Sequence, residues 1–255
     1  MSEIRLETQA LSRRFGALMA LQEIDFQLAA GARHALIGPN GAGKTTFVNV
    51  LTGVLPPTHG RVLLAGRDIT ETAQAERVKL GIARTFQINR LFRGLSVLEN
   101  VCIAVAERVG VARSMFYPTG WHTDVIDESM SLLQTLKLAE AASHRVSELP
   151  YGRQRLVELA IAIGLKPEIL LLDEPAAGVP SAESHIILDA IERLPEHIAV
   201  LIIEHDMDVV FRFAKRVTVM VGGAVFAEGT PKEIESNPMV REVYLGQGAQ
   251  WTGHA

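Results

Sequence analysis

The chain has 255 residues, of which 48% are hydrophobic and 21% are charged, the proportions of an ordinary soluble globular protein. The formal net charge of -4 argues against a nucleic-acid partner, because such partners usually require a basic face. The single cysteine excludes an internal disulfide framework and suits a reducing cytoplasm. The length accommodates one large α/β domain, or a core with an inserted lobe.

The first part of the chain predicts strands. Apolar and polar residues alternate over residues 4–11 and 18–28, which indicates antiparallel strands with one face in water. The short apolar run 33–37 predicts a buried strand. Two more strands are expected over 61–65 and 82–87, each entered through a glycine.

A glycine-rich loop lies between the strand at 33–37 and a predicted helix that ends near Gly53. The loop consists of Gly38, Pro39, Asn40, Gly41, Ala42, Gly43, Lys44, Thr45 and Thr46, and it fits the pattern G-x-x-x-x-G-K-[ST]. Its backbone N–H groups can wrap a phosphate chain, and the following helix directs its positive end at that charge. Lys44 can reach the outer phosphates, and Thr45 offers a hydroxyl to Mg²⁺. The loop predicts a nucleoside triphosphate site.

The middle of the chain predicts helices, with caps at Ser96, near Thr123 and around Pro150. The stretch 109–121 has no clear period, so we expect a loop or short insertion there, and its function stays open. From Pro167 the α/β alternation returns. Strands are expected over 169–172, 198–203, 217–221 and 225–228, with helices over 181–194 and 207–214. A capping box from Thr230 to Glu233, with Pro231 at the first helical position, starts a short closing helix.

This order predicts an α/β P-loop core with an N-terminal antiparallel β subdomain and an inserted α-helical subdomain. We expect one domain over residues 1–250. Its parts are the core with the β subdomain at 1–90 and 165–230, the helical subdomain at 91–164, and a C-terminal helix and tail at 231–255.

Two acidic residues follow the apolar strand at 169–172. The carboxyl end of such a strand delivers Asp173 and Glu174 to the crevice where α/β proteins bind ligands. Asp173 suits the Mg²⁺ shell of a P-loop site, and Glu174 can polarise an attacking water as general base. Taken alone, the pair fits an acidic turn after a core strand as well as it fits a catalytic site. Together with the glycine-rich loop it predicts a nucleotide hydrolysis site.

In this arrangement the chain resembles the ATP-binding cassette (ABC) family over nearly its whole length. The resemblance implies that Phe15 stacks on adenine and that Gln87 senses Mg²⁺ and contacts a membrane partner. It also implies that His205 acts at the γ-phosphate and that Lys44 has an electrostatic role in the same reaction. Mg²⁺ would be held by Thr45, Gln87 and Asp173. As isolated residues, Phe15, Gln87 and His205 also fit a core aromatic, a solvated strand end and a capping residue.

Residues 149–154, Leu-Pro-Tyr-Gly-Arg-Gln, fall where that family carries its L-S-G-G-Q signature, which covers the ATP held by a second cassette. Pro150 replaces the serine and has neither a hydroxyl nor an N–H to offer. The amides of Tyr151 and Gly152 still head a helix, so we expect them to face the partner's nucleotide. Whether the composite site that uses this signature hydrolyses ATP is left open. The turn after Glu174 also lacks the aspartate that many cassettes place there.

Within that family, the chain resembles the ATPase subunits of branched-chain amino acid importers. Three segments carry this resemblance: Ala176-Ala177-Gly178, Glu204-His205-Asp206-Met207 and Gly229-Thr230-Pro231. The resemblance implies a second ATPase subunit (identical or different), two transmembrane permeases and, indirectly, an extracytoplasmic solute-binding protein. It places the chain on the cytoplasmic face of a bacterial plasma membrane, held through the permeases. Relatives of these importers also carry urea, short amides or aromatic acids, so the cargo stays open.

Two alternatives keep the loop but change the function. Some cassette ATPases act on nucleic acid or ribosomes, but those usually carry coiled coils, zinc fingers or a second cassette. A P-loop kinase or GTPase conflicts with the segment 149–154 and with an acidic pair before proline.

Overall fold

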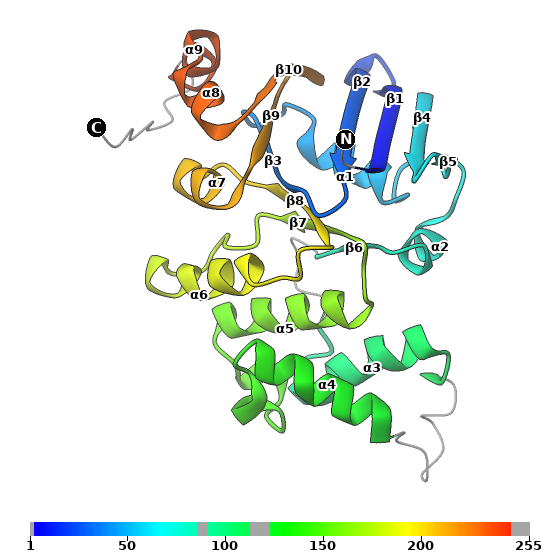
Figure 1. The fold of residues 1–255 in the computed structure, drawn as a ribbon, viewed down its shortest axis with the longest axis vertical. Coiled ribbons are helices and arrows are strands. Elements are labelled where there is room, and N and C mark those ends of the chain that lie inside the picture. Colours follow the sequence, from blue (N-terminus) through cyan, green and yellow to red (C-terminus); the bar gives the residue numbers. More distant parts are fainter. Residues whose placement is uncertain (1–2, 86–90, 113–122, 246–255) are drawn as a thin grey trace. The chain divides into compact units, whose positions relative to one another are not determined.

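The computed structural model describes residues 3–85, 91–112 and 123–245. The chain forms two compact units. The core unit comprises residues 1–82, 168–174 and 195–255, and the helical unit comprises residues 83–167 and 175–194. The elements are labelled in chain order in Figure 1.

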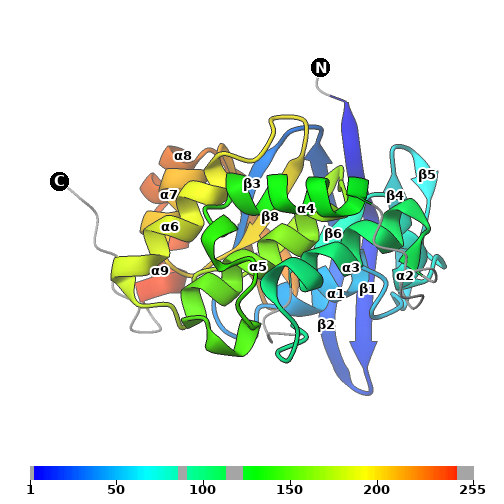
Figure 2. The same cartoon turned by 90° about the horizontal axis from the view of Figure 1, so that it is seen from below.

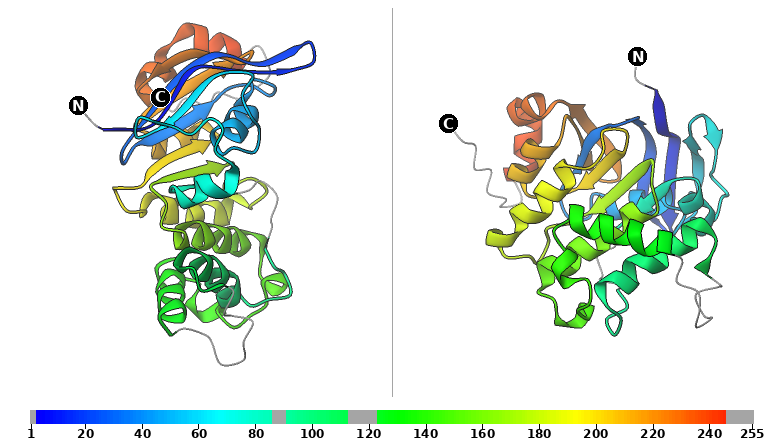
Figure 3. Two further views of the ribbon diagram at one scale, coloured as in Figure 1. Left: turned by 90° about the vertical axis from the view of Figure 1, so that its right-hand side faces the viewer. Right: turned by 60° about the horizontal axis from the view of Figure 1, so that its bottom comes forward.

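A four-stranded antiparallel sheet of order β2-β1-β4-β5 lies in the core unit. Its strands are β1 (Ile4–Phe15), β2 (Leu18–Ala29), β4 (His59–Leu64) and β5 (Arg67–Asp68). β1 and β2, the long blue pair in Figure 3, run antiparallel from Ile4 opposite Ala29 to Phe15 opposite Leu18, with several register shifts. The predicted antiparallel pair is therefore present, and β1 extends four residues beyond its predicted end at Leu11.

The second sheet has six strands in the order β10-β9-β3-β8-β7-β6. They are β3 (Arg33–Ile37), β6 (Ile82–Arg84), β7 (Ile169–Asp173), β8 (Ala199–Ile203), β9 (Arg216–Val221) and β10 (Ala224–Gly229). β9, β3, β8 and β7 pair in parallel, and β10 closes the sheet antiparallel to β9. All residues of β7 and β8 are buried, as expected for central parallel strands with apolar sequences.

The helices of the core unit are short. They are α1 (Lys44–Leu51), α2 (Gln74–Lys79), α7 (Met207–Phe213), α8 (Pro231–Ser236) and α9 (Pro238–Leu245). The helical unit contains α3 (Val97–Val109), α4 (Thr123–Thr135), α5 (Tyr151–Gly164) and α6 (Ser181–Glu192), with 3-10 turns at Ala139–Ala141 and Val146–Glu148. α3, α4 and α5 pack on one another, as Figure 2 shows. Among the helices of the described residues, none has the length and apolar character needed to span a membrane.

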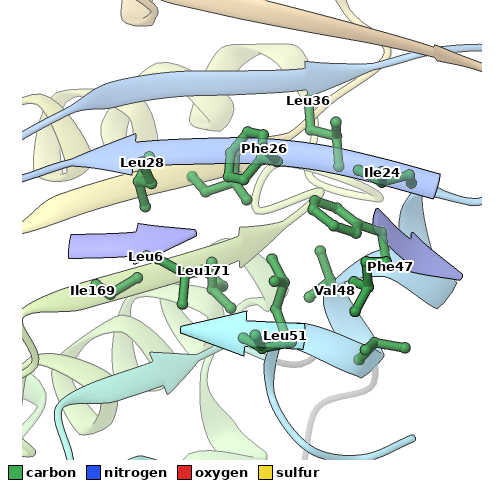
Figure 4. Packing of buried hydrophobic residues seen from close by; sticks show 14 of the residues in the cluster. Leu6, Ile24, Phe26, Leu28, Leu36, Phe47, Val48, Leu51, Ile169 and Leu171 are labelled. Carbon is green, nitrogen blue, oxygen red and sulfur yellow. The ribbon is translucent and has the colours of Figure 1, made fainter. Parts of the chain in front are cut away.

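The hydrophobic core of the core unit joins β1, β2, α1 and β7 (Figure 4). Phe47 of α1 meets Phe26 of β2 edge to face, with 5.4 Å between ring centroids. Leu51 is fully buried one turn further along α1, and Leu171 presents the apolar side of β7. This packing holds α1, and with it the loop that precedes α1, against both sheets.

The carboxyl end of α1 is held by a buried arginine that sequence reasoning missed. Arg77 of α2 is 1% exposed, and its Nη1 donates to the carbonyls of Val50 and Leu51 at 2.8 and 2.7 Å. These carbonyls belong to the last turn of α1. The carbonyl of Val50 also accepts from the N–H of Gly53 at 3.2 Å, and Arg77 adds a charged donor at this helix end. α2 escaped prediction because six residues are too few for a periodic signal.

Two predicted elements differ from the structure. The strand expected over 82–87 ends at Arg84, while residues 86–90 lie outside the described residues. The single closing helix is two helices, because Pro238 disfavours helical geometry at Asn237 and starts α9 anew. The helix cap predicted at Ser96 is formed, as a capping box with Glu99, and the capping box predicted at Thr230 is formed as well.

Candidate functional site

The glycine-rich loop connects the end of β3 with the start of α1 at Lys44. A Cβ atom at Gly38 would lie 2.2 Å from the carbonyl oxygen of Met220, and one at Gly43 would lie 2.6 Å from that of Ala20. Gly43 also has a φ of 98°, which side chains rarely tolerate. Only glycine fits at these two positions. The loop is thus seated against the backbones of β2 and β9.

The other loop residues are placed for contact with a phosphate chain. Asn40, Gly41 and Thr45 are exposed, and α1 begins without a side-chain cap or an acidic residue in its first turn. Over the described residues, no side-chain cap occupies the amide groups at this helix start, so none competes there with an anion. The remaining loop residues predicted to bind nucleotide, Pro39, Ala42 and Thr46, are partly or fully buried within the same turn.

Lys44 lies close to the acidic pair. Its Nζ donates to the carbonyls of Gly38 and Pro39 at 2.6 and 3.0 Å. Burial lowers the pKa of Lys44, and the nearby charges of Glu174 and Asp173 oppose that shift. The structure therefore brings the loop lysine and both predicted acids into one electrostatic neighbourhood.

The sheet register explains how the acids and His205 meet. Asp173, the last residue of β7, lies opposite Ile203, the last residue of β8, so the segments that follow leave the sheet at one level. Glu174 adopts a φ of 46°, a left-handed conformation that costs a non-glycine residue about 1–2 kcal/mol and clusters at functional sites. In this conformation its Oε1 lies 3.6 Å from Nδ1 of His205.

Phe15 lies at the end of β1, on the same unit as the loop. Its side chain is 40% exposed, and it pairs with Leu18 across the hairpin. Two residues further along β2, Ala20 reaches Gly43 of the loop, as described above. The exposed ring of Phe15 is thus connected to the phosphate loop through the start of β2. In this position a base could stack on the ring.

Two further predicted site residues belong to the helical unit. Tyr151 and Gly152 start α5 in the helical unit, and Gly152 is buried. The ring of Tyr151 lies under the guanidinium of Arg155, 5.0 Å from its centroid, and 3.4 Å from the place a Cβ of Gly178 would occupy. Tyr151 therefore packs on the turn that follows Glu174 and Pro175 in the chain. Gln87 falls outside the described residues.

Sequence reasoning missed one carboxyl group at this site, that of Glu204. Its side chain follows β8 directly, is 3% exposed, and leaves Oε1 without a hydrogen bond. The pKa of Glu204 is raised to about 7, chiefly by burial; the charges of Glu174 and Asp206 contribute to the increase, and hydrogen bonds from the backbone of residues 205 and 206 oppose it. The signal in the sequence was an acidic residue at the end of an apolar strand, directly before His205.

The buried carboxyl predicts a pH dependence of stability. Glu204 has an ordinary pKa near 4.5 when unfolded and about 7 when folded. Between these values the unfolded chain loses a proton that the folded protein keeps, so the free energy of unfolding falls as the pH rises, by about 3 kcal/mol in total. Glu204→Gln should remove this loss and be more stable than the parent above pH 7. Urea unfolding of both proteins between pH 5 and pH 8 measures the free energy of unfolding at each pH. If this free energy changed with pH in the same way for both proteins, the prediction would be contradicted.

Comparisons with known proteins show the family to which the chain belongs. The family model described as "ABC transporter" matches residues 21–177, and the one described as "Branched-chain amino acid ATP-binding cassette transporter" matches residues 224–250. The chain is 37% identical over 254 residues to the high-affinity branched-chain amino acid transport ATP-binding protein LivG of Escherichia coli K12, covering 97% of this chain and 100% of LivG. A probable LivG of Archaeoglobus fulgidus is 36% identical over 247 residues, covering 94% and 95% of the two chains.

Solved structures show the same fold. A nucleotide-free ATP-binding cassette from an ABC transporter superposes with a TM-score of 0.84 at 31% identity, covering 96% of this chain and 100% of that one. A second cassette of an ABC transporter, in its ADP conformation, gives 0.84 at 33% identity, covering 96% and 99%. The predicted α/β cassette fold is confirmed. Because a family model matches more than half of the chain and relatives above 30% identity match nearly all of it, the chain belongs to the ABC transporter family as an ATP-binding, ATP-hydrolysing subunit.

Proposed function

We propose that this chain energises the import of branched-chain or other hydrophobic amino acids, or of a related small solute, through partner permeases. One observation carries the proposal: relatives named for high-affinity branched-chain amino acid transport align with the chain from end to end. The match over residues 224–250 to the branched-chain family supports it independently of the phosphate loop.

In the proposed mechanism, the loop 38–46 holds the phosphates of ATP and Phe15 offers one face of its ring to adenine. Lys44 exchanges its bonds to the carbonyls of Gly38 and Pro39 for bonds to phosphate oxygens, and these are stronger because both partners are charged. Thr45 and Asp173, together with Gln87, would hold Mg²⁺, since an exposed hydroxyl and a carboxylate are the hard oxygen ligands that this ion prefers. When bound, Mg²⁺ neutralises developing charge on the phosphates.

Glu174 is the proposed general base. Its carboxylate is 27% exposed, so water can approach it, and its left-handed backbone aims it toward His205. Glu174 accepts a proton from the attacking water, and His205 donates a hydrogen bond to the reacting phosphate. Lys44 supplies the fixed positive charge, as phosphoryl transfer requires.

The proposed assembly contains a second ATPase subunit, two permeases and an extracytoplasmic solute-binding protein that acts through them. The backbone amides of Tyr151 and Gly152 would cover the ATP held by the second ATPase. The chain would then work on the cytoplasmic face of a bacterial plasma membrane. Action on nucleic acid is the disfavoured alternative, given a net charge of -4.

ATP hydrolysis by reconstituted components tests this function. The purified chain should be a weak ATPase. Its turnover should rise when the sister ATPase and both permeases are present in vesicles, and rise again with the loaded solute-binding protein. High, cooperative turnover by the isolated chain would argue for a self-sufficient homodimer. Stimulation by nucleic acid or ribosomes would contradict the importer.

A further inference from the structure

Phe15 does not stand alone at the end of β1. Arg13, two residues earlier on the same strand, places its guanidinium carbon 4.6 Å from the centroid of the Phe15 ring. This distance lies within the range of a cation–π interaction, in which the positive group is attracted to the negative face of the ring. One face of Phe15 is therefore covered by a cation.

The arginine is itself anchored. Its Nη1 donates to the carbonyl of Pro56 at 2.8 Å, and the neighbouring backbone is tied to the same segment. Arg14 donates its N–H to the hydroxyl of Thr58 at 3.0 Å, and the N–H of Thr58 donates to the carbonyl of Ser12 at 2.7 Å. Arg13 is thus a half-buried, fixed group, whereas Phe15 itself is 40% exposed.

The charge of Arg13 has no acidic partner among the residues that the structure describes. In the described part of the chain no carboxylate pairs with its guanidinium, and its Nε is buried without a hydrogen bond. An unpaired guanidinium over a ring draws electron density toward itself, so the opposite face of the ring becomes less negative. That face is the better surface for the electron-rich plane of a purine.

We propose that Arg13 is a positioning residue for the nucleotide base: it occupies one face of Phe15, holds the ring in place and leaves only the other face for adenine. This inference rests on the proposed function, in which Phe15 is the base platform. Arg13 acts through Phe15 and has no part in phosphate binding or in the chemical step.

Arg13→Met tests the proposal, because methionine keeps an unbranched apolar stem and removes the cation. ATP affinity should fall about two- to fivefold, the size of an exposed cation–π interaction. KM should rise by the same factor while kcat stays unchanged. Affinity for inorganic tripolyphosphate, which has no base, should stay at the parent value. Arg13→Lys should lie nearer to the parent than Arg13→Met does.

Two comparisons make the result decisive. Arg14→Met removes an equal charge from the adjacent exposed position and should leave ATP affinity unchanged. In a Phe15→Ala background, Arg13→Met should have no further effect, because the ring through which it acts is gone.

The possible failures can be told apart. If Phe15→Ala leaves ATP affinity at the parent value, the base platform of the proposed function is wrong, and this inference falls with it. If Phe15→Ala weakens ATP binding but Arg13→Met does not, only the inference is overturned. An equal loss of tripolyphosphate binding in Arg13→Met, or an undiminished effect without Phe15, would overturn it as well, since Arg13 would then act on the loop and not on the base.

Discussion

Replacing Glu174 with glutamine is expected to stop ATP turnover while ATP binding persists. Glutamine keeps the size and the hydrogen-bonding reach of the side chain but cannot take a proton from water. A positioned general base contributes about 10²- to 10⁴-fold in rate, so kcat should fall by at least about 100-fold. Nucleotide affinity should stay within about twofold of the parent, because Lys44 and the loop amides are untouched. Steady-state hydrolysis by the assembled ATPases, together with nucleotide titration, measures both quantities.

Glu168 supplies the matched control for this prediction. Glu168 directly precedes β7, whereas Glu174 directly follows that strand. Glu168 lies on the surface in an ion pair with Arg5 at 3.4 Å. Glu168→Gln makes the same chemical change at the opposite end of the same strand, so its turnover should equal that of the parent. Turnover of Glu174→Gln at the parent rate would remove Glu174 as the base.

The second large effect is expected for Lys44→Ala, which should lower ATP affinity by at least about 100-fold. Hydrogen bonds to a charged group contribute about 1.5–3 kcal/mol each, and Lys44 is the loop's only side-chain cation for the phosphates. In the structure its ammonium bonds to the carbonyls of Gly38 and Pro39, so no rearrangement of the chain is needed to bring it to the loop. Titration with ATP and with ADP measures the loss.

Lys79→Ala controls for the loss of a lysine. Lys79 lies at the exposed end of α2, where it pairs with Glu76 at 2.8 Å, and its removal should leave ATP affinity unchanged. Circular dichroism should show the parent fold for both variants, since the lost bonds of Lys44 lie within one loop. Undiminished ATP binding by Lys44→Ala would contradict the assignment of the loop.

The strands and helices around the site were predictable because their signals are local. Continuous apolar runs identify β7 and β8, and capping chemistry identifies the starts of α3 and α8. Where signals were weak or short, the prediction was wrong or silent: α2 was missed, and the strand that begins at Ile82 was drawn too long. The domain boundaries, the roles of the site residues and the contact of Gln87 stay predictions.

The sequence by itself indicated that this protein binds a nucleotide and predicted the loop that would hold the phosphates, because the spacing of Gly38, Gly43 and Lys44 encodes a loop conformation within nine residues. It also determined that Asp173 and Glu174 are the acidic residues at the carboxyl end of the central strand. Only the tertiary structure decided how these groups meet: the left-handed turn at Glu174, its 3.6 Å approach to His205 and the burial of Glu204. It alone decided that Arg13 covers one face of Phe15 and that Arg77 caps α1. These contacts join residues through strand register and packing, and no local pattern of residues carries that information.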